Sequence, residues 1–181
     1  MKSLLLSFTL LCFLSFNSNA QSFTLSSSSL QGQFLSLDEF NGFGCSGENQ
    51  SPQLSWKNAP ANTKSFAITM YDPDAPTGSG WWHWLVFDLP ADLNSLPKGA
   101  GATDGKTLPK GCIQSPTDYG SPGYGGPCPP EGHGDHQYII TVYALDVAQL
   151  GLNATTNAAV VGYYLGNHTI AKASIVAYYG R

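Results

Sequence analysis

Side chains alternate with a period of two along much of this chain, which is the pattern of β-strands. The alternation is clearest in three segments, 66–71, 83–88 and 138–145, and a last strand is expected over 174–179. Because successive side chains of a strand point to opposite faces, the second segment has two sets of side chains: Trp84, Val86 and Asp88 on one face, His83, Leu85 and Phe87 on the other. The pattern therefore predicts a mainly β protein.

The remaining periodic signal is one short helix, expected from about residue 157 to 165. Thr156 or Asn157 supplies the N-cap, and Gly166 is expected at its end. The strands do not alternate with helices, as they would in a parallel α/β fold. This spacing predicts an antiparallel β-sandwich with a single helix at its periphery.

The first twenty residues have the features of a secretory signal peptide. Lys2 supplies a positive charge, residues 4–16 form an apolar stretch, and Ser18-Asn19-Ala20 places small residues before a cleavage site. The apolar stretch is too short to cross a bilayer of roughly 30 Å as a helix. Cys12 raises a lipoprotein alternative, but Leu11 stands where a lipobox has a small residue. We therefore expect cleavage after Ala20 and a periplasmic or secreted protein.

The remaining residues, 21–181, have a length that suits one domain with its own core. Without Lys2, seven basic residues stand against twelve acidic ones, a formal charge of −5. This sign argues against binding to nucleic acid or anionic membranes by bulk charge. Cys45, Cys112 and Cys128 fit one disulfide and one free thiol in an oxidising compartment. No Cys-x-x-Cys pair supports a zinc knuckle or a thioredoxin-type site.

A few polar residues stand out in a chain of which only 11% is charged. The turn 72–76 reads Asp-Pro-Asp-Ala-Pro, and His83 follows near the start of the next expected strand. A loop over 115–134, stiffened by prolines, leads into His136 and Tyr138, whose side chains share one strand face. If these groups converge, they form a pocket for a small anion or a metal ion.

Several spaced motifs occur in a fixed order: Asp-Pro-Asp-Ala-Pro at 72–76, Trp-Trp-His-Trp at 81–84, Gly-Gly-Pro-Cys-Pro-Pro-Glu-Gly at 125–132 and His-Gln-Tyr at 136–138. Together with the segment 40–56, they resemble the phosphatidylethanolamine-binding protein family, and more closely its bacterial branch, often called Raf kinase inhibitor-like. The match runs from about Phe34 to the C-terminus. It implies two antiparallel sheets in a Greek-key sandwich with one or two short peripheral helices.

The resemblance also implies which residues bind a ligand. The family's anion pocket corresponds in this chain to Asp72, His83, Gly126, Pro129, Pro130, His136 and Tyr138. The pocket wall and entrance are expected to include Trp81, Trp82 and Tyr124. Imidazole N–H, phenol O–H and backbone N–H groups are suitable donors to phosphate oxygens.

The two carboxylates of the 72–76 turn are expected to have different roles. A carboxylate beside a phosphate is repulsive unless it is protonated or faces an ammonium group, as in phosphoethanolamine. Asp72 is therefore expected to be protonated or to pair with His83 or His136. Asp74 suits a role in fixing the turn by accepting backbone N–H bonds. The other histidines, His133 and His168, are expected to face solvent.

Exported members of the family tend to carry cysteines at the positions of Cys45 and Cys128. The resemblance therefore favours the Cys45–Cys128 disulfide, with Cys112–Cys128 as the alternative. Such a bridge would tie the segment before Asn49 to the pocket wall. The resemblance implies no cofactor.

Binding of a small anion or phosphorylated headgroup, or docking of a protein partner at the pocket rim, is the function these residues favour. One alternative is a hydrolase that uses the same pocket, either with a metal held by two histidines and Asp72 or with a histidine as general base. The first form lacks a compact histidine pair such as His-x-His, and the second lacks a nucleophile in a Gly-x-Ser-x-Gly turn. Inhibition of a protease or kinase is a further alternative. We therefore expect a protein that is not an enzyme.

Overall fold

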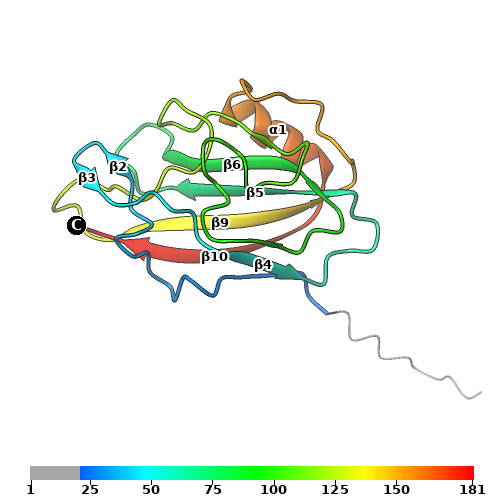
Figure 1. Cartoon of the computed structure of the whole chain (residues 1–181), viewed down its shortest axis with the longest axis horizontal. Helices are drawn as coiled ribbons and strands as arrows, with labels where there is room; N and C mark the ends of the chain where they lie inside the picture. Colours follow the sequence, from blue (N-terminus) through cyan, green and yellow to red (C-terminus); the bar gives the residue numbers. More distant parts are fainter. Residues whose placement is uncertain (1–20) are drawn as a thin grey trace, which may run out of the picture.

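The main sheet has five strands, all paired antiparallel, in the order β10-β9-β5-β6-β8. The computed structural model describes residues 21–181 (Figure 1), so the expected signal peptide lies outside the described residues. The strands of this sheet are β5 (Ser65–Asp72), β6 (Trp81–Pro90), β8 (Ile113–Gln114), β9 (His136–Leu145) and β10 (Thr169–Tyr179). The segments 66–71 and 138–145 are strands as predicted, and the last strand begins five residues before residue 174.

A second, smaller sheet packs on one face of the main sheet. It has the order β1-β4-β7, with strands at Thr24–Ser26, Leu54–Lys57 and Ser95–Leu96. Between the two sheets lies the larger hydrophobic core, whose members include Leu54, Trp56, Phe66, Ile68, Trp84, Tyr138 and Ile140. A two-stranded hairpin, β2 (Asn41–Gly42) and β3 (Cys45–Ser46), stands at one end of the molecule. The predicted antiparallel, mainly β architecture is confirmed.

The helix α1 (Ala158–His168) covers part of the opposite face of the main sheet (Figure 1). It buries Val161 and Leu165 in a second core. The Asn157 side chain accepts the Val160 N–H as the N-cap, as predicted. The predicted end at Gly166 is wrong, because the helix continues to His168. Thr169 ends it instead, donating its backbone N–H and its hydroxyl to the Leu165 carbonyl oxygen.

Two register shifts in the pairing of β5 with β6 change the faces predicted for β6. His83 is the extra residue where Met70 pairs with Trp84 and Tyr71 pairs with Trp82. A bulge of this kind reverses the alternation of side chains beyond it. The His83 ring therefore contacts Tyr138, on the side of the larger core, and does not share a face with Leu85 and Phe87.

The second register shift lies near Asp88, which has a positive φ of 60°. Its carboxylate accepts the backbone N–H of Leu150, a member of the core beneath α1. The prediction that Asp88 shares a face with Trp84 and Val86 is therefore wrong. No helix among residues 21–181 is long and apolar enough to span a bilayer.

Candidate functional site

A pocket with a volume of about 190 Å³ opens at the end of the larger core. It is bounded by the end of β5, the beginnings of β6 and β9, the turn of the β2–β3 hairpin and the proline-rich loop before β9. Seven of the residues expected at a binding site line it: Asp72, Trp81, His83, Pro129, Pro130, His136 and Tyr138. The structure thus brings the start of β9 beside the end of β5 and the start of β6, which are neighbours in sequence but distant from β9.

Asp72 is the buried last residue of β5, and its two carboxylate oxygens have separate partners. Its Oδ1 accepts the backbone N–H groups of Asp74 and Ala75, at 2.8 and 3.0 Å. Its Oδ2 lies 2.8 Å from Nδ1 of His136. Asp72 therefore pairs with one of the two histidines expected for it. Asp74 accepts a backbone N–H, as expected, but from Gln137 of β9 at 2.8 Å; the N–H groups of the turn itself are held by Asp72.

Both ring nitrogens of His136 have partners. Nδ1 donates to Asp72, and Nε2 lies 3.3 Å from Nδ1 of His133. His133 is exposed, as expected of a loop residue, yet its ring contacts the site. The prediction that His133 faces solvent did not include this contact, because the contact forms only when the loop before β9 folds back toward the site.

His83 is held by its backbone bulge and by one hydrogen bond. Its Nδ1 lies 2.8 Å from the Gly125 carbonyl oxygen, so Nδ1 carries the proton and donates. Its Nε2 is buried without a hydrogen-bond partner among residues 21–181. Burial lowers the pKa of His83 to about 4, although the Gly125 bond and the Asp72 charge act to raise it. His83 is therefore neutral at pH 7 and offers a lone pair.

Two further pocket residues have buried polar atoms without a partner in the described part of the chain. These are the hydroxyl of Tyr138 and the indole N–H of Trp81. Burial, followed by the charge of Asp72, raises the pKa of Tyr138, so the phenol remains protonated at neutral pH. Buried polar groups without partners are uncommon in native proteins and call for an explanation such as a ligand or ordered water.

Three residues expected at the pocket do not line it: Trp82, Tyr124 and Gly126. Trp82 points to the opposite face of the sheet, where it packs against Tyr71 beside the helix, because the His83 bulge separates it from the pocket. Tyr124 is buried in the larger core and donates its hydroxyl to the Asp38 carbonyl at 3.1 Å.

Gly126 has a packing role. A Cβ at this position would collide with the Asp38 carbonyl oxygen, and the Gly126 carbonyl accepts the Tyr119 hydroxyl at 2.9 Å. Its backbone N–H donates to Asn49 Oδ1 at 2.7 Å. Gly126 therefore sits behind the pocket wall and lets the loop pack closely.

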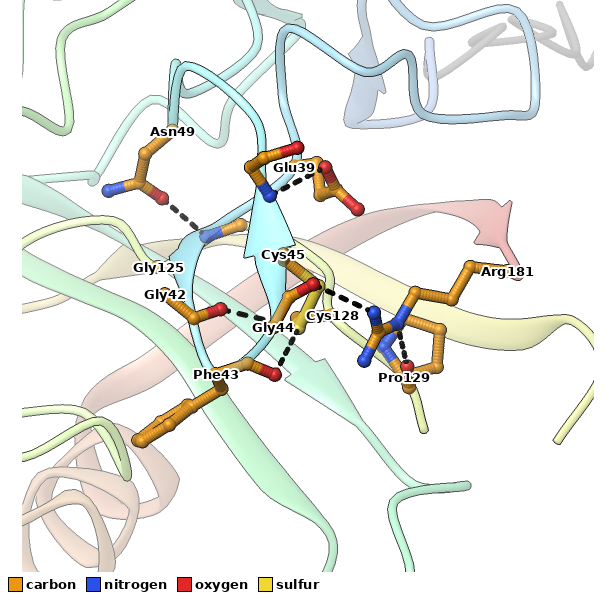
Figure 2. The surroundings of a disulfide bond; sticks show 12 residues. Glu39, Gly42, Phe43, Gly44, Cys45, Asn49, Gly125, Cys128, Pro129 and Arg181 are labelled. Carbon is orange, nitrogen blue, oxygen red and sulfur yellow. Dashed lines mark hydrogen bonds between the residues drawn. A yellow bond between two sulfur atoms is a disulfide. The ribbon is translucent and has the colours of Figure 1, made fainter. Parts of the chain in front are cut away.

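A disulfide joins Cys45 of the β2–β3 hairpin to Cys128 of the pocket loop (Figure 2). This is the bridge that the resemblance favours, and Cys112 is the free cysteine of the described chain. The Arg181 guanidinium adds a second link, with Nε donating to the Pro129 carbonyl and Nη1 to the Gly44 carbonyl, at 2.6 and 3.0 Å. The hairpin and the loop are thus fixed to each other.

Sequence reasoning missed two aromatic residues at the pocket. Phe43, at the tip of the hairpin, lines the pocket with its side chain 71% exposed and with a positive φ of 53°. Tyr119 stacks on Phe40 at a centroid distance of 4.0 Å and also lines the pocket. Both lie in irregular segments, where periodicity carries no signal. In the sequence, only the family motif around Cys45 indicated that this hairpin belongs to the site.

The described chain is thus an antiparallel two-sheet protein with a small pocket at the end of its core, formed by an Asp–His pair, a neutral histidine and a proline-rich loop. The family model for "Phosphatidylethanolamine-binding protein" matches residues 26–180. This chain belongs to the phosphatidylethanolamine-binding protein family.

Two proteins of Escherichia coli K12 are similar along the sequence. The UPF0098 protein YbcL is 45% identical over 181 residues, which cover 99% of this chain and 98% of the relative. The UPF0098 protein YbhB is 50% identical over 138 residues, or 76% of this chain and 86% of the relative. The crystal structure of E. coli YbcL superposes with a TM-score of 0.87 at 44% identity, covering 89% of this chain and 99% of that one.

Proposed function

We propose that this protein is an exported binding module, and not an enzyme, that holds a small phosphorylated group such as a phospholipid headgroup in the pocket. One observation carries the proposal: three pocket-lining residues, Trp81, His83 and Tyr138, each have a buried polar atom with no partner among residues 21–181. A polar ligand would supply those partners and recover the free energy lost on burying them.

The size of the pocket supports a headgroup over a whole lipid. Its volume of about 190 Å³ is below the roughly 300–1,000 Å³ typical of pockets for drug-sized ligands. Phosphoethanolamine fits such a space, and acyl chains do not. The remainder of a larger ligand would emerge past Phe43 and the prolines at 76, 129 and 130.

The chemistry of the pocket suits a ligand with both acceptors and donors. The Tyr138 hydroxyl and the Trp81 indole can donate to phosphate oxygens, whereas the free nitrogen of His83 can only accept. This corrects the expectation that the imidazoles donate to the phosphate, because both Nδ1 atoms already donate to protein oxygens. The family to which the chain belongs is named for phosphatidylethanolamine, a phospholipid whose headgroup is phosphoethanolamine, which supports this class of ligand.

The hydrolase alternative finds less support in the same geometry. A general base needs an open nitrogen near a nucleophile. Nε2 of His136 faces His133, and the open Nε2 of His83 has no serine or free cysteine among the described residues that line the pocket. Among residues 21–181, no group of three or more histidine, cysteine or acidic side chains is arranged to hold a metal ion. Docking of a protein partner at the rim remains compatible with the proposal, because Phe43 is exposed there.

Calorimetric titration of the purified protein with phosphoethanolamine tests the proposal. We expect saturable one-to-one binding. Tyr138→Phe should weaken it by about 3- to 10-fold, the equivalent of one hydrogen bond worth roughly 0.5–1.5 kcal/mol. Tyr163→Phe is the matched control, because Tyr163 is exposed on α1 far from the pocket residues, and it should leave the affinity unchanged. No heat from the wild-type protein would reject the proposal.

A further inference from the structure

Of the four imidazole nitrogens of His83 and His136, only Nε2 of His83 has no hydrogen-bond partner among residues 21–181. His136 uses both of its nitrogens, on Asp72 and on His133. His83 donates from Nδ1 to the Gly125 carbonyl, which leaves Nε2 as an unprotonated acceptor. Since a carbonyl oxygen cannot donate, the tautomer of neutral His83 is fixed by this contact. A ligand group beside Nε2 must therefore bring its own hydrogen.

The surroundings of His83 keep it in this state. The side chain is 2% exposed, and the rings of Tyr119 and Tyr138 pack edge-on against it. The charged groups that act on it are the carboxylates of Asp72 and Asp118, which favour protonation less strongly than burial opposes it. His136, with His133 beyond it, is the other titratable group at this wall, on the far side of the Asp72 carboxylate.

The pocket also lacks a cation suited to a doubly charged phosphate. No lysine or arginine is among its lining residues in the described chain. Arg181 lies near, but its guanidinium donates to the carbonyl oxygens of Pro129 and Gly44. A phosphate dianion would meet the lone pair of His83 and the carboxylate of Asp72, and both contacts are repulsive. A protonated phosphate oxygen removes one charge and supplies the missing donor.

We infer that the pocket selects the monoprotonated form of a phosphate monoester, whose P–OH group donates to Nε2 of His83 while its other oxygens accept from Tyr138 and Trp81. The inference rests on the proposed function and narrows it to phosphate monoesters such as free phosphoethanolamine, because the diester phosphate of an intact phospholipid has no P–OH group to donate. His83 is then the residue that distinguishes phosphate monoesters from sulfate esters, which have the same shape but carry no proton at neutral pH.

Calorimetry with the wild-type protein and three small ligands, ethyl phosphate, ethylphosphonate and ethyl sulfate, tests the inference between pH 5.5 and 8.5. The second pKa of a phosphate monoester is about 6, so its monoanion falls from about half at pH 6 to about 1% at pH 8. The affinity for total ethyl phosphate should therefore fall about 50-fold between pH 6 and pH 8. Ethylphosphonate has a higher second pKa, and its decline should move to higher pH. Ethyl sulfate should bind at least about tenfold more weakly than ethyl phosphate at pH 6.

Two variants test whether His83 is the residue responsible for the pH dependence and for the preference for phosphate over sulfate. Trp81→Phe removes a donor, so it should weaken ethyl phosphate binding and leave the pH profile unchanged. His83→Asn can keep a donor near the Gly125 carbonyl, but its shorter side chain cannot place an acceptor where Nε2 of His83 lies, so phosphate and sulfate esters should bind it equally.

Equal binding of phosphate and sulfate by the wild-type protein, or an affinity that does not fall with pH, would overturn the inference and leave the proposed function standing. A decline at the same pH for phosphate and phosphonate would overturn it too, because the titrating group would then belong to the protein and not to the ligand. If phosphoethanolamine and all three ligands fail to bind at every pH, the proposed function fails, and the inference with it.

Discussion

His83 owes its position to a bulge in β6, where it is the extra residue opposite β5. The bulge turns its ring toward Tyr138 and brings Nδ1 to the Gly125 carbonyl. A single backbone irregularity therefore sets both the direction and the tautomer of the side chain. Burial of His83 destabilises the folded protein at low pH, because a protonated imidazole loses its hydration in this position.

The stability of the protein should depend on pH through His83. Its pKa is about 4 when folded and about 6.5 in the unfolded chain, so the unfolded state binds a proton first as the pH falls. The free energy of unfolding should therefore decrease from pH 7.5 to pH 5, by about 2 kcal/mol from this residue alone. Urea unfolding at the two pH values, for the wild-type protein and for His83→Asn, measures the effect.

The difference between the two proteins isolates His83 from the other histidines. His136 and His168 each pair with a carboxylate, and both pairs remain in the variant. Between pH 7.5 and pH 5, the free energy of unfolding of the variant should fall by about 2 kcal/mol less than that of the wild-type protein. Equal loss of stability in both proteins would show that His83 is not held in its neutral form.

At the scale of the elements, the β2–β3 hairpin and the loop before β9 together form one wall of the pocket. The hairpin carries Phe43 and the loop carries Pro129 and Pro130, and all three line the pocket. The Cys45–Cys128 disulfide joins them (Figure 2), and hydrogen bonds from Arg181 reach both. An irregular loop without such links would have many conformations, and ordering it would weaken ligand binding.

Removing the disulfide should destabilise the protein and loosen this wall. The two cysteines are 83 residues apart, a loop for which the chain-entropy model gives at most about 4–5 kcal/mol. The double variant Cys45→Ala with Cys128→Ala should lose a large part of that free energy in urea unfolding. It should also bind phosphoethanolamine more weakly than the wild-type protein does.

Cys112→Ala is the control for this variant. Cys112 is free and half-buried, and burial raises its pKa to about 11, so the thiol is unreactive at neutral pH. Its replacement should cost about 1 kcal/mol or less, for the loss of a partly buried sulfur. A loss for the double variant no larger than for Cys112→Ala would contradict the role given to the disulfide.

At the scale of the whole molecule, periodicity predicted the strands 66–71 and 138–145 because their side chains alternate between two buried environments. It failed where the backbone departs from regular geometry. The bulges in β6 changed the faces of His83 and Asp88, and a threonine hydroxyl, not a glycine, ended the helix. Such departures depend on partner strands and on contacts distant in sequence.

The site was predictable to a similar extent. Asp72 and His136 follow from a turn and a strand start, which local sequence shows. The pairing of these two residues, across 64 positions, follows only from the antiparallel register of β5 with β9. Phe43 and Tyr119 reach the pocket from irregular segments, so no periodic signal could identify them. The family motifs indicated the disulfide, which spacing alone left open.

The most direct test of a phosphate pocket at the end of the sandwich is the indole N–H region of the ¹H–¹⁵N NMR spectrum during a titration with phosphoethanolamine. The protein has four tryptophans. The Trp81 cross-peak should shift to saturation, because its indole N–H has no partner among residues 21–181 and gains an acceptor from the ligand. The Trp84 cross-peak should stay in place, because its N–H donates to buried Gln114 at 2.7 Å. A spectrum in which Trp81 does not move at saturating ligand would contradict the account.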